Sequence, residues 1–182
     1  MEVIKRDLSQ TSFLVVEDNV HMRSILRSIL TGYGVRQVFE ASEGADGLEI
    51  ALERVPDIIL LDWNMSPVSG SDFLRVLRDD RDPILSTTPV LMISAYCQRA
   101  TVIEALKRGI HGFIAKPVSP VILYRHVIDI LVRQERDGRS KGLTVKIGAK
   151  KDQPRSKLAA PSIANLKPKP EEPQDDSMMA LL

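Results

Sequence analysis

Residues 58–61 form an unbroken run of aliphatic side chains that ends abruptly at Asp62. A run without polar residues is typical of a strand that is buried on both faces, as in a parallel sheet with helices on each side. Pro56 precedes the run, and the loop-forming residues 65–70 follow it. The run therefore predicts a central strand of a parallel sheet, with a carboxylate at its carboxyl end.

Four other segments of the chain have strand character, and most of them also end in polar residues. They are residues 13–16, followed by Glu17 and Asp18; residues 35–41; residues 89–93, followed by Ser94; and residues 112–115, followed by Lys116. The second of these is the least apolar, which favours a place nearer the edge of the sheet. The sequence thus predicts five strands.

Apolar residues at helical spacing separate these strands and follow the last one. The first helix is expected to place Met22, Ile25, Leu26, Ile29 and Leu30 on one face, and further helices are expected over residues 45–54, 71–78, 99–108 and 120–136. In the last helix, the expected inward side chains are Val121, Leu123, Val127, Ile130 and Leu131. This alternation indicates an α/β fold with a doubly wound, five-stranded parallel sheet, (βα)5. The flavodoxin-like strand order 2-1-3-4-5 is one of the two common arrangements.

The domain organisation follows from composition. We expect a polar leader over residues 1–11, one domain over 12–137 and a disordered tail over 138–182, because the tail has several prolines and no apolar period. The tail has nine Lys or Arg against five Asp or Glu, and it includes an acidic patch at 171–176 and an apolar segment at 178–182 that could be a docking motif. The rest of the chain is mildly acidic and has no helix-turn-helix pattern, so we expect no DNA-binding domain.

Three features bear on the cellular compartment. The single cysteine, Cys97, excludes a disulfide framework within the chain. No apolar run approaches the ~18 residues of a membrane span. The first residues lack the apolar core of a signal peptide. We therefore expect a cytoplasmic protein without a membrane span.

The strand ends predict a site. In a 2-1-3-4-5 sheet, the first and third strands are neighbours at the point where the strand order reverses, so Glu17, Asp18 and Asp62 converge in one crevice. Three adjacent carboxylates repel one another, and a hard divalent cation such as Mg²⁺ offsets that repulsion. Lys116 adds an ammonium group and Ser94 a hydroxyl. This set of groups indicates phosphoryl transfer to an oxygen of Asp62.

Each of these residues has a simpler interpretation when it is taken alone. Asp18 or Asn19 could cap the following helix. Ser94 could be a turn hydroxyl, and Lys116 could be a solvated side chain. Capping does not explain Asp62, however, and the whole set favours a functional site.

Two alternative functions, a phosphatase and a nucleotide-binding module, are disfavoured. A haloacid-dehalogenase-type phosphatase also uses an Asp nucleophile with Mg²⁺, but it needs a second Asp two residues later, where this chain has Asn64. A nucleotide-binding module of flavodoxin type is disfavoured because no glycine-rich phosphate loop follows the first strand.

Four short motifs, in order and each at a strand end, resemble the response-regulator receiver domain of two-component signalling. They are Val16-Glu17-Asp18-Asn19, Leu61-Asp62-Trp63-Asn64-Met65, Ser94-Ala95 and Lys116-Pro117. The second is similar to the stand-alone, CheY-like chemotaxis regulators. The resemblance extends from about residue 13 to residue 136 and does not include the tail.

The resemblance implies roles for these residues. Asp62 would be the phosphoacceptor, and Glu17, Asp18, Asp62 and the Asn64 backbone carbonyl would hold Mg²⁺. Ser94 and Lys116 would contact the phosphoryl oxygens, and the Lys116-Pro117 bond would be cis. Ser94 would be drawn to the phosphoryl group on activation, so that Phe113 turns inward.

The implied protein is a phosphorylatable switch and a phosphoprotein. It would not be an enzyme in its own right, but a phosphoacceptor that assists its own phosphorylation and dephosphorylation. A sensor histidine kinase or a phosphotransfer protein would supply the phosphoryl group. A downstream protein would bind the face made by the fourth helix, the fifth strand and the fifth helix. The alternative is a receiver-like interaction module that is never phosphorylated.

Two positions depart from the common pattern of the family, and two others bear on the phosphate lifetime. Ser66 stands where the family commonly has Pro, and Phe113 lacks the hydroxyl of the frequent Tyr. In the family, the residues at Asn64 and Tyr96 tune the lifetime of the phosphate. We expect the Tyr96 ring to shield the phosphoryl group from water, although its hydroxyl could instead orient the water, or the side chain could point toward the output face.

Overall fold

The computed structural model describes residues 6–95 and 98–137. Its centre is an all-parallel, five-stranded sheet in the order β2-β1-β3-β4-β5, which confirms the predicted strand order and the doubly wound α/β fold. The strands are β1 (Ser12–Val16), β2 (Gln37–Ala41), β3 (Ile58–Asp62), β4 (Val90–Ser94) and β5 (Gly112–Ala115). The weakly apolar second strand lies at one edge, as its composition predicted.

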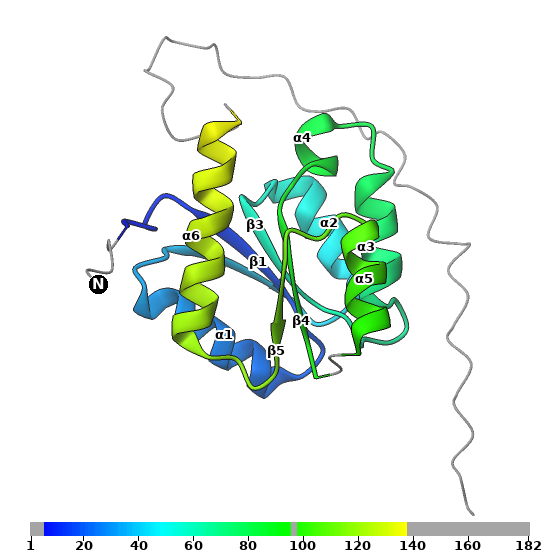
Figure 1. Cartoon of the computed structure of the whole chain (residues 1–182), viewed down its shortest axis with the longest axis horizontal. Helices are drawn as coiled ribbons and strands as arrows, with labels where there is room; N and C mark the ends of the chain where they lie inside the picture. Colours follow the sequence, from blue (N-terminus) through cyan, green and yellow to red (C-terminus); the bar gives the residue numbers. More distant parts are fainter. Residues whose placement is uncertain (1–5, 96–97, 138–182) are drawn as a thin grey trace, which may run out of the picture.

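Helices cover both faces of the sheet (Figure 1). They are α1 (Val20–Gly32), α2 (Gly44–Arg54), α3 (Gly70–Arg78), α4 (Pro83–Ser86), α5 (Arg99–Lys107) and α6 (Pro120–Arg136). One core cluster joins the sheet to α1 and α6, and a second joins it to α2, α3 and α5. None of the helices in the described part of the chain has the length and apolar composition that a transmembrane span requires.

The short helix α4 was not predicted. The sequence around Pro83 indicated only a break, but the Asp82 side chain accepts a hydrogen bond from the Ile84 backbone N–H at 2.8 Å. Pro83 fits the first helical position, where a missing N–H costs nothing. A single helical turn forms as a result, and the helices that we expected to be the fourth and fifth are α5 and α6.

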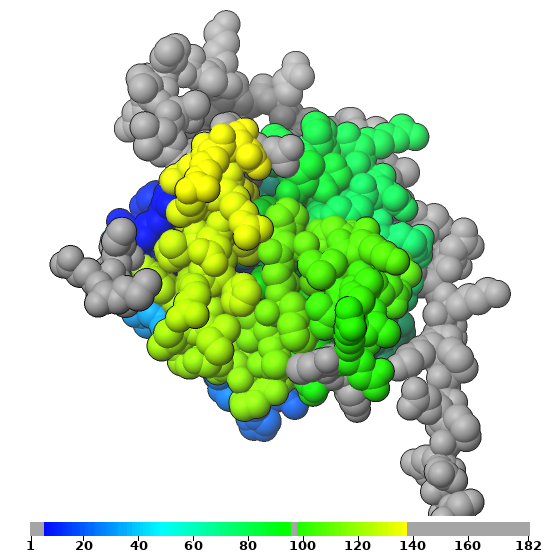
Figure 2. Space-filling model, in the orientation of Figure 1, coloured from blue at the N-terminus to red at the C-terminus, as the bar shows by residue number. Residues whose placement is uncertain are grey.

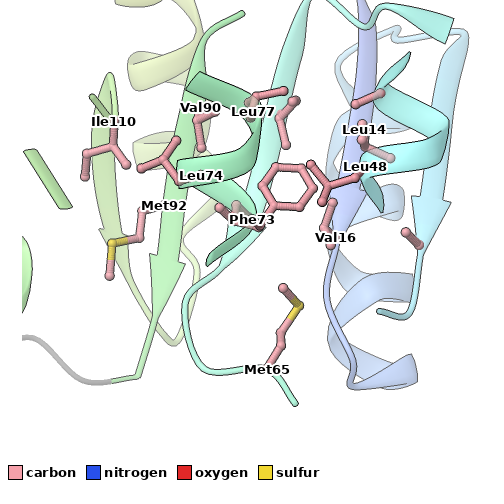
Figure 3. Packing of buried hydrophobic residues seen from close by; sticks show 14 of the residues in the cluster. Leu14, Val16, Leu48, Met65, Phe73, Leu74, Leu77, Val90, Met92 and Ile110 are labelled. Carbon is pink, nitrogen blue, oxygen red and sulfur yellow. The ribbon is translucent and has the colours of Figure 1, made fainter. Parts of the chain in front are cut away.

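The three central strands are buried along their whole length. Val16 of β1 pairs with Ala41 and with Leu61, so the carboxyl ends of β1, β2 and β3 lie level with one another. Figure 3 shows Val16, Leu48 and Phe73 packed together, with Val90 and Met92 of β4 in the same cluster, which also includes Ala105 of α5. This rigid core fixes where the residues that follow each strand can lie.

Two predicted inward positions are wrong. Ile25 is 51% exposed and Val121 is 63% exposed. Ile25 is one residue from buried Leu26, and Val121 is two residues from buried Leu123. Because successive residues of a helix are rotated by about 100°, both side chains turn away from the sheet. An apolar stripe in the sequence was therefore wider than the buried stripe.

The predicted leader is partly attached to the domain. Leu8 is buried in the core cluster beneath α1 and α6, with 1% of its surface exposed. The Arg6 backbone N–H donates a hydrogen bond to the Tyr124 hydroxyl at 2.8 Å. Leu8 stands between the polar residues 5–7 and 9–12, so it gave no periodic signal. Residues 1–5 and the predicted tail at 138–182 lie outside the described residues.

The Arg78 side chain connects α3 to two other parts of the chain. Its guanidinium donates to the Ser86 carbonyl at 2.9 Å and to the Gly109 carbonyl at 2.8 Å. These contacts link α3 to α4 and to the turn between α5 and β5. Burial lowers the pKa of Arg78 to about 10.

In Figure 2, α5, β5 and α6 form a continuous surface on the side of the molecule toward the viewer.

Candidate functional site

The carboxyl ends of β1 and β3 bring three carboxylates together. Oxygens of Glu17, Asp18 and Asp62 lie within 4.8 Å of one another. Glu17 and Asp62 are buried, with 1% and 4% of their surfaces exposed, whereas Asp18 is exposed. Neighbouring strands at the reversal of strand order account for this convergence, as the sequence predicted.

Lys116 provides the positive charge of the site. Its Nζ lies 2.9 Å from Asp62 Oδ2 and 2.9 Å from Glu17 Oε2. Burial acts to lower the pKa of Lys116, but the hydrogen bonds to Glu17 and Asp62 and the charges of both carboxylates outweigh it, so the pKa is raised. The ammonium group is thus held in its charged form between the two buried acids.

The negative charge of the Glu17 carboxylate is only partly compensated by its neighbours. Burial raises the pKa of Glu17, Lys116 acts against this rise, and the charges of Asp62 and Asp18 add to it. Its buried Oε2 accepts no hydrogen bond within the described part of the chain, although it faces the Lys116 ammonium. A buried carboxylate oxygen without a hydrogen bond, beside two further carboxylates, is a donor set that suits a hard divalent cation such as Mg²⁺. The residues present therefore fit the metal that the sequence predicted.

The second oxygen of Asp62 is held by the loop that follows β3. The Asn64 backbone N–H donates to Asp62 Oδ1 at 3.2 Å. The Asn64 side-chain carbonyl accepts a hydrogen bond from Ser94 Oγ at 3.3 Å. Ser94, at the end of β4, is thereby connected to Asp62 through Asn64. Both oxygens of the Asp62 carboxylate are fixed in place.

The turn between β1 and α1 presents Asp18. Asn19 caps α1, because its side-chain oxygen accepts hydrogen bonds from the His21 and Met22 backbone N–H groups, both at 3.0 Å. One turn further on, the Arg23 guanidinium donates to the Glu17 carbonyl at 2.7 Å. The sequence analysis missed Arg23, since a lone arginine on a helix gives no signal of such a contact. Because Asn19 makes the cap, the Asp18 carboxylate stays exposed at the site.

The loop between β3 and α3 is held down at both ends. Met65 is 6% exposed and belongs to the core cluster, and Figure 3 shows its side chain below the rest of that cluster. The Gly70 backbone N–H donates to the Trp63 carbonyl at 3.1 Å. A Cβ at Gly70 would lie 2.5 Å from the Asp62 carbonyl oxygen and 2.7 Å from Trp63 Cα. Only glycine lets the start of α3 approach the end of β3 this closely.

The remaining predicted residues have different outcomes. Phe113 is partly buried and packs against the core cluster of α2, α3 and α5. The Lys116-Pro117 bond is cis, as the resemblance implied, and the Ser66-Pro67 bond, at the departure from the family pattern, is cis as well. Tyr96 lies outside the described residues. The Asn64 backbone carbonyl as a metal ligand stays a prediction.

Residues 13–128 match the model of the response regulator receiver domain. The chain belongs to this family. Over 120 residues it is 33% identical to the chemotaxis protein CheY of Pseudomonas aeruginosa, a match that covers 66% of this chain and 95% of that protein. The receiver domain is thus the folded part described above, and the chain is a CheY-like response regulator of the two-component type.

Solved structures support the same assignment. The chemotaxis protein CheY4 of Vibrio cholerae superposes with a TM-score of 0.62 at 26% identity, over 66% of this chain and 98% of that chain. A putative response regulator from Chloroflexus aurantiacus superposes with a TM-score of 0.63 at 27% identity, over 68% of this chain and 98% of that chain. Each of these two structures aligns over nearly its whole length with the receiver domain of this chain. The tail therefore lies outside the part that the three proteins share.

Gly70→Ala tests how the loop positions Asp62. The added methyl group would meet backbone atoms that cannot rotate away, so we expect the free energy of unfolding to fall by about 1–3 kcal/mol. Gly32→Ala is the matched control, since a Cβ there would have no atom within 4 Å. Urea denaturation of both variants measures the difference, and equal stabilities would show that the loop adapts to the extra methyl group.

Proposed function

We propose that Asp62 accepts a phosphoryl group from a phosphohistidine of a sensor histidine kinase or a phosphotransfer protein. The observation that carries the proposal is the arrangement at Asp62 itself. Its Oδ1 accepts a hydrogen bond from the Asn64 N–H, and its Oδ2 lies 2.9 Å from Lys116 Nζ, beside Glu17 and Asp18. A carboxylate that is fixed at both oxygens next to a cation is well positioned as a nucleophile.

The phosphoryl group moves from a nitrogen atom of the donor to an oxygen atom of Asp62. An oxygen of Asp62 forms a bond to phosphorus while the bond from phosphorus to the donor's imidazole nitrogen breaks, and that nitrogen keeps the electron pair and takes up a proton. Lys116 is close enough to pair with the transferred phosphoryl oxygens, and Ser94 can donate its hydroxyl to them. Such pre-positioned charges stabilise the transition state without reorganisation.

Glu17, Asp18 and Asp62 are the residues that would hold Mg²⁺, together with the Asn64 backbone carbonyl. When bound, Mg²⁺ neutralises charge on the phosphoryl oxygens. The exposed position of Asp18 leaves one side of the cluster open to solvent and to a donor. The protein's own part is to hold these carboxylates close together, to which the Lys116 ammonium contributes through its ion pairs with Glu17 and Asp62.

Phosphorylation would act as a switch through Ser94. In the unmodified protein, Ser94 Oγ donates to the Asn64 side chain at 3.3 Å. A phosphoryl group on Asp62 offers a charged acceptor, which is the stronger partner. Ser94 would turn toward it, and partly buried Phe113 would move inward into the space that this leaves. The two residues sit on β4 and β5, so the change reaches the surface of α5, β5 and α6.

The proposed output is protein contact. A downstream protein would bind the surface of α5, β5 and α6 in one of the two states. The chain would not be an enzyme acting on a separate substrate; it would be a phosphoacceptor that assists its own phosphorylation and dephosphorylation. Asn64 and Tyr96 would tune the phosphate lifetime, with the Tyr96 ring shielding the phosphoryl group.

Acetyl phosphate and Mg²⁺ test the phosphoacceptor. We expect the intact mass of the full chain to rise by one phosphoryl group, because a small acyl phosphate can replace the donor histidine. Asp62→Asn should abolish the rise, whereas Asp46→Asn, at an exposed position of α2, should leave it unchanged. A folded wild-type protein that stays unmodified would support the alternative of a receiver-like module that is never phosphorylated.

Backbone amide NMR shifts test the switch. On phosphorylation we expect shifts in the Asp62 loop and also across residues 99–125, because the Ser94 and Phe113 movements reach that surface. In Ser94→Ala, the loop shifts should remain and those across residues 99–125 should shrink. Shifts that stay confined to the Asp62 loop of the wild-type protein would contradict the proposed switch.

A further inference from the structure

Apolar side chains are exposed on both helices next to the edge strand β5. Of seven large apolar side chains exposed in the described part of the chain, four lie on α5 and α6. They are Ile103 (41% exposed), Leu106 (53%), Val121 (63%) and Ile122 (45%). We call the surface of residues 99–108, 112–115 and 120–130 the edge face; Figure 2 shows that its three elements adjoin one another. Several exposed apolar side chains on adjoining elements are a feature of interaction surfaces.

The two helices leave this surface open for identifiable reasons. Ala105 is the one residue of α5 that is fully buried, so most of that helix remains uncovered. On α6, His126 lies over β5, since its Nδ1 would be 3.2 Å from a Cβ at Gly112. Ile122 is one turn before His126 and therefore lies on the side of α6 that borders β5. The edge face thus has apolar groups on both of its flanks.

The charges of the edge face are mainly positive. Its exposed cations outnumber its exposed acids; the cations are Arg99, Lys107, Arg108 and Arg125, and the acids are Glu104 and Asp129. Glu104 pairs with Arg108 at 2.9 Å, which leaves three cations against one acid. A ligand for this surface should therefore carry both apolar side chains and negative charge.

One segment of this chain has that chemistry. Residues 171–176 include Glu171, Glu172, Asp175 and Asp176, and residues 178–182 include Met178, Met179, Leu181 and Leu182. The preceding part, residues 138–170, holds all nine Lys and Arg of the tail and would be repelled by a cationic surface. We propose that residues 171–182 bind the edge face of the same chain, with the apolar residues on Leu106 and Ile122 and the acids on the surrounding cations.

The length of the tail suits binding within one chain. From Ile122 to Arg136, α6 rises by about 21 Å, at 1.5 Å per residue. Residues 138–170 would connect the end of α6 to the proposed segment, and a flexible chain of that length has a root-mean-square span of about 30 Å. A linker whose span is close to the required distance gives a high effective concentration, so even a weak contact is populated.

The consequence for signalling rests on the proposed function. If the edge face binds a downstream protein, the tail segment competes with that protein in cis. Movement of Ser94 and Phe113 on phosphorylation would alter the same surface and thereby the competition. The binding of the tail itself requires no phosphoryl group, so it is measured on the unmodified protein, separately from phosphorylation of Asp62.

Paramagnetic broadening in the full chain tests the proposal. A nitroxide is attached at Ala180→Cys in a Cys97→Ser background, and amide signals are compared before and after reduction of the label. We expect residues 99–107 and 120–126 to lose signal intensity while α1 and α2 keep theirs. Absence of any loss, or equal loss over all helices, would overturn the proposal.

Two controls define the contact. Changing Met178, Met179, Leu181 and Leu182 together to Ser should restore the signals, whereas changing Leu158, Ile163 and Leu166 together to Ser, in the basic part of the tail, should not. A mixture of ¹⁵N-labelled protein without nitroxide and unlabelled protein with nitroxide separates binding within one chain from binding between chains. Little broadening in the mixture supports the proposal; broadening as strong as in the single species would assign the tail to a second copy and contradict it.

Discussion

The ion pairs of Lys116 with Asp62 and Glu17 are the interaction on which the carboxyl edge of the sheet depends. Two buried carboxylates and an exposed one lie within 4.8 Å, and isolated buried charges are costly. Lys116 comes from the end of β5, beyond β4, and its Nζ reaches Asp62 Oδ2 at 2.9 Å. Removal of one partner from such a group leaves an uncompensated charge, which destabilises more than the intact group stabilises. The site therefore holds a repulsion between carboxylates that a divalent cation can relieve.

The same strand connects the site to the surface. Lys116 follows β5 directly, and Phe113 lies within that strand, partly buried against the core cluster. Next to it, α5 is anchored by one buried residue, Ala105, and by the Arg78 contacts to the Gly109 carbonyl. A change at Asp62 thus has a short path to a loosely packed helix. A weakly anchored element of this kind is where a small shift in free energy changes conformation.

Much of the fold and of the site could be predicted from the sequence. Aliphatic runs of four or five residues specify buried strands, and the residue after each run must lie at the carboxyl edge, which is why Glu17, Asp18, Asp62, Ser94 and Lys116 were found. The two exposed residues Ile25 and Val121 were misplaced because apolar periodicity shows a stripe but not how much of it the sheet covers.

Other features depend on contacts between distant residues and leave no local pattern. Leu8 enters the core from a polar segment, and Arg23 holds the Glu17 carbonyl. The requirement for Gly70 follows from the approach of α3 to the end of β3, which no spacing rule gives. The hydrogen bond between Ser94 and Asn64 likewise joins the end of β4 to the loop after β3, across 30 positions of the sequence.

The dependence of stability on Mg²⁺ tests most directly whether the three carboxylates act as one site. Urea unfolding of the full chain should show a rise in the free energy of unfolding, of about 2.7 kcal/mol at a free concentration of a hundred times Kd. The double variant Glu17→Gln, Asp18→Asn should show no rise, whereas Asp46→Asn with Glu49→Gln, at exposed positions of α2, should behave like the wild type. No rise in the wild type, or an equal rise in the Glu17 and Asp18 variant, would contradict the account.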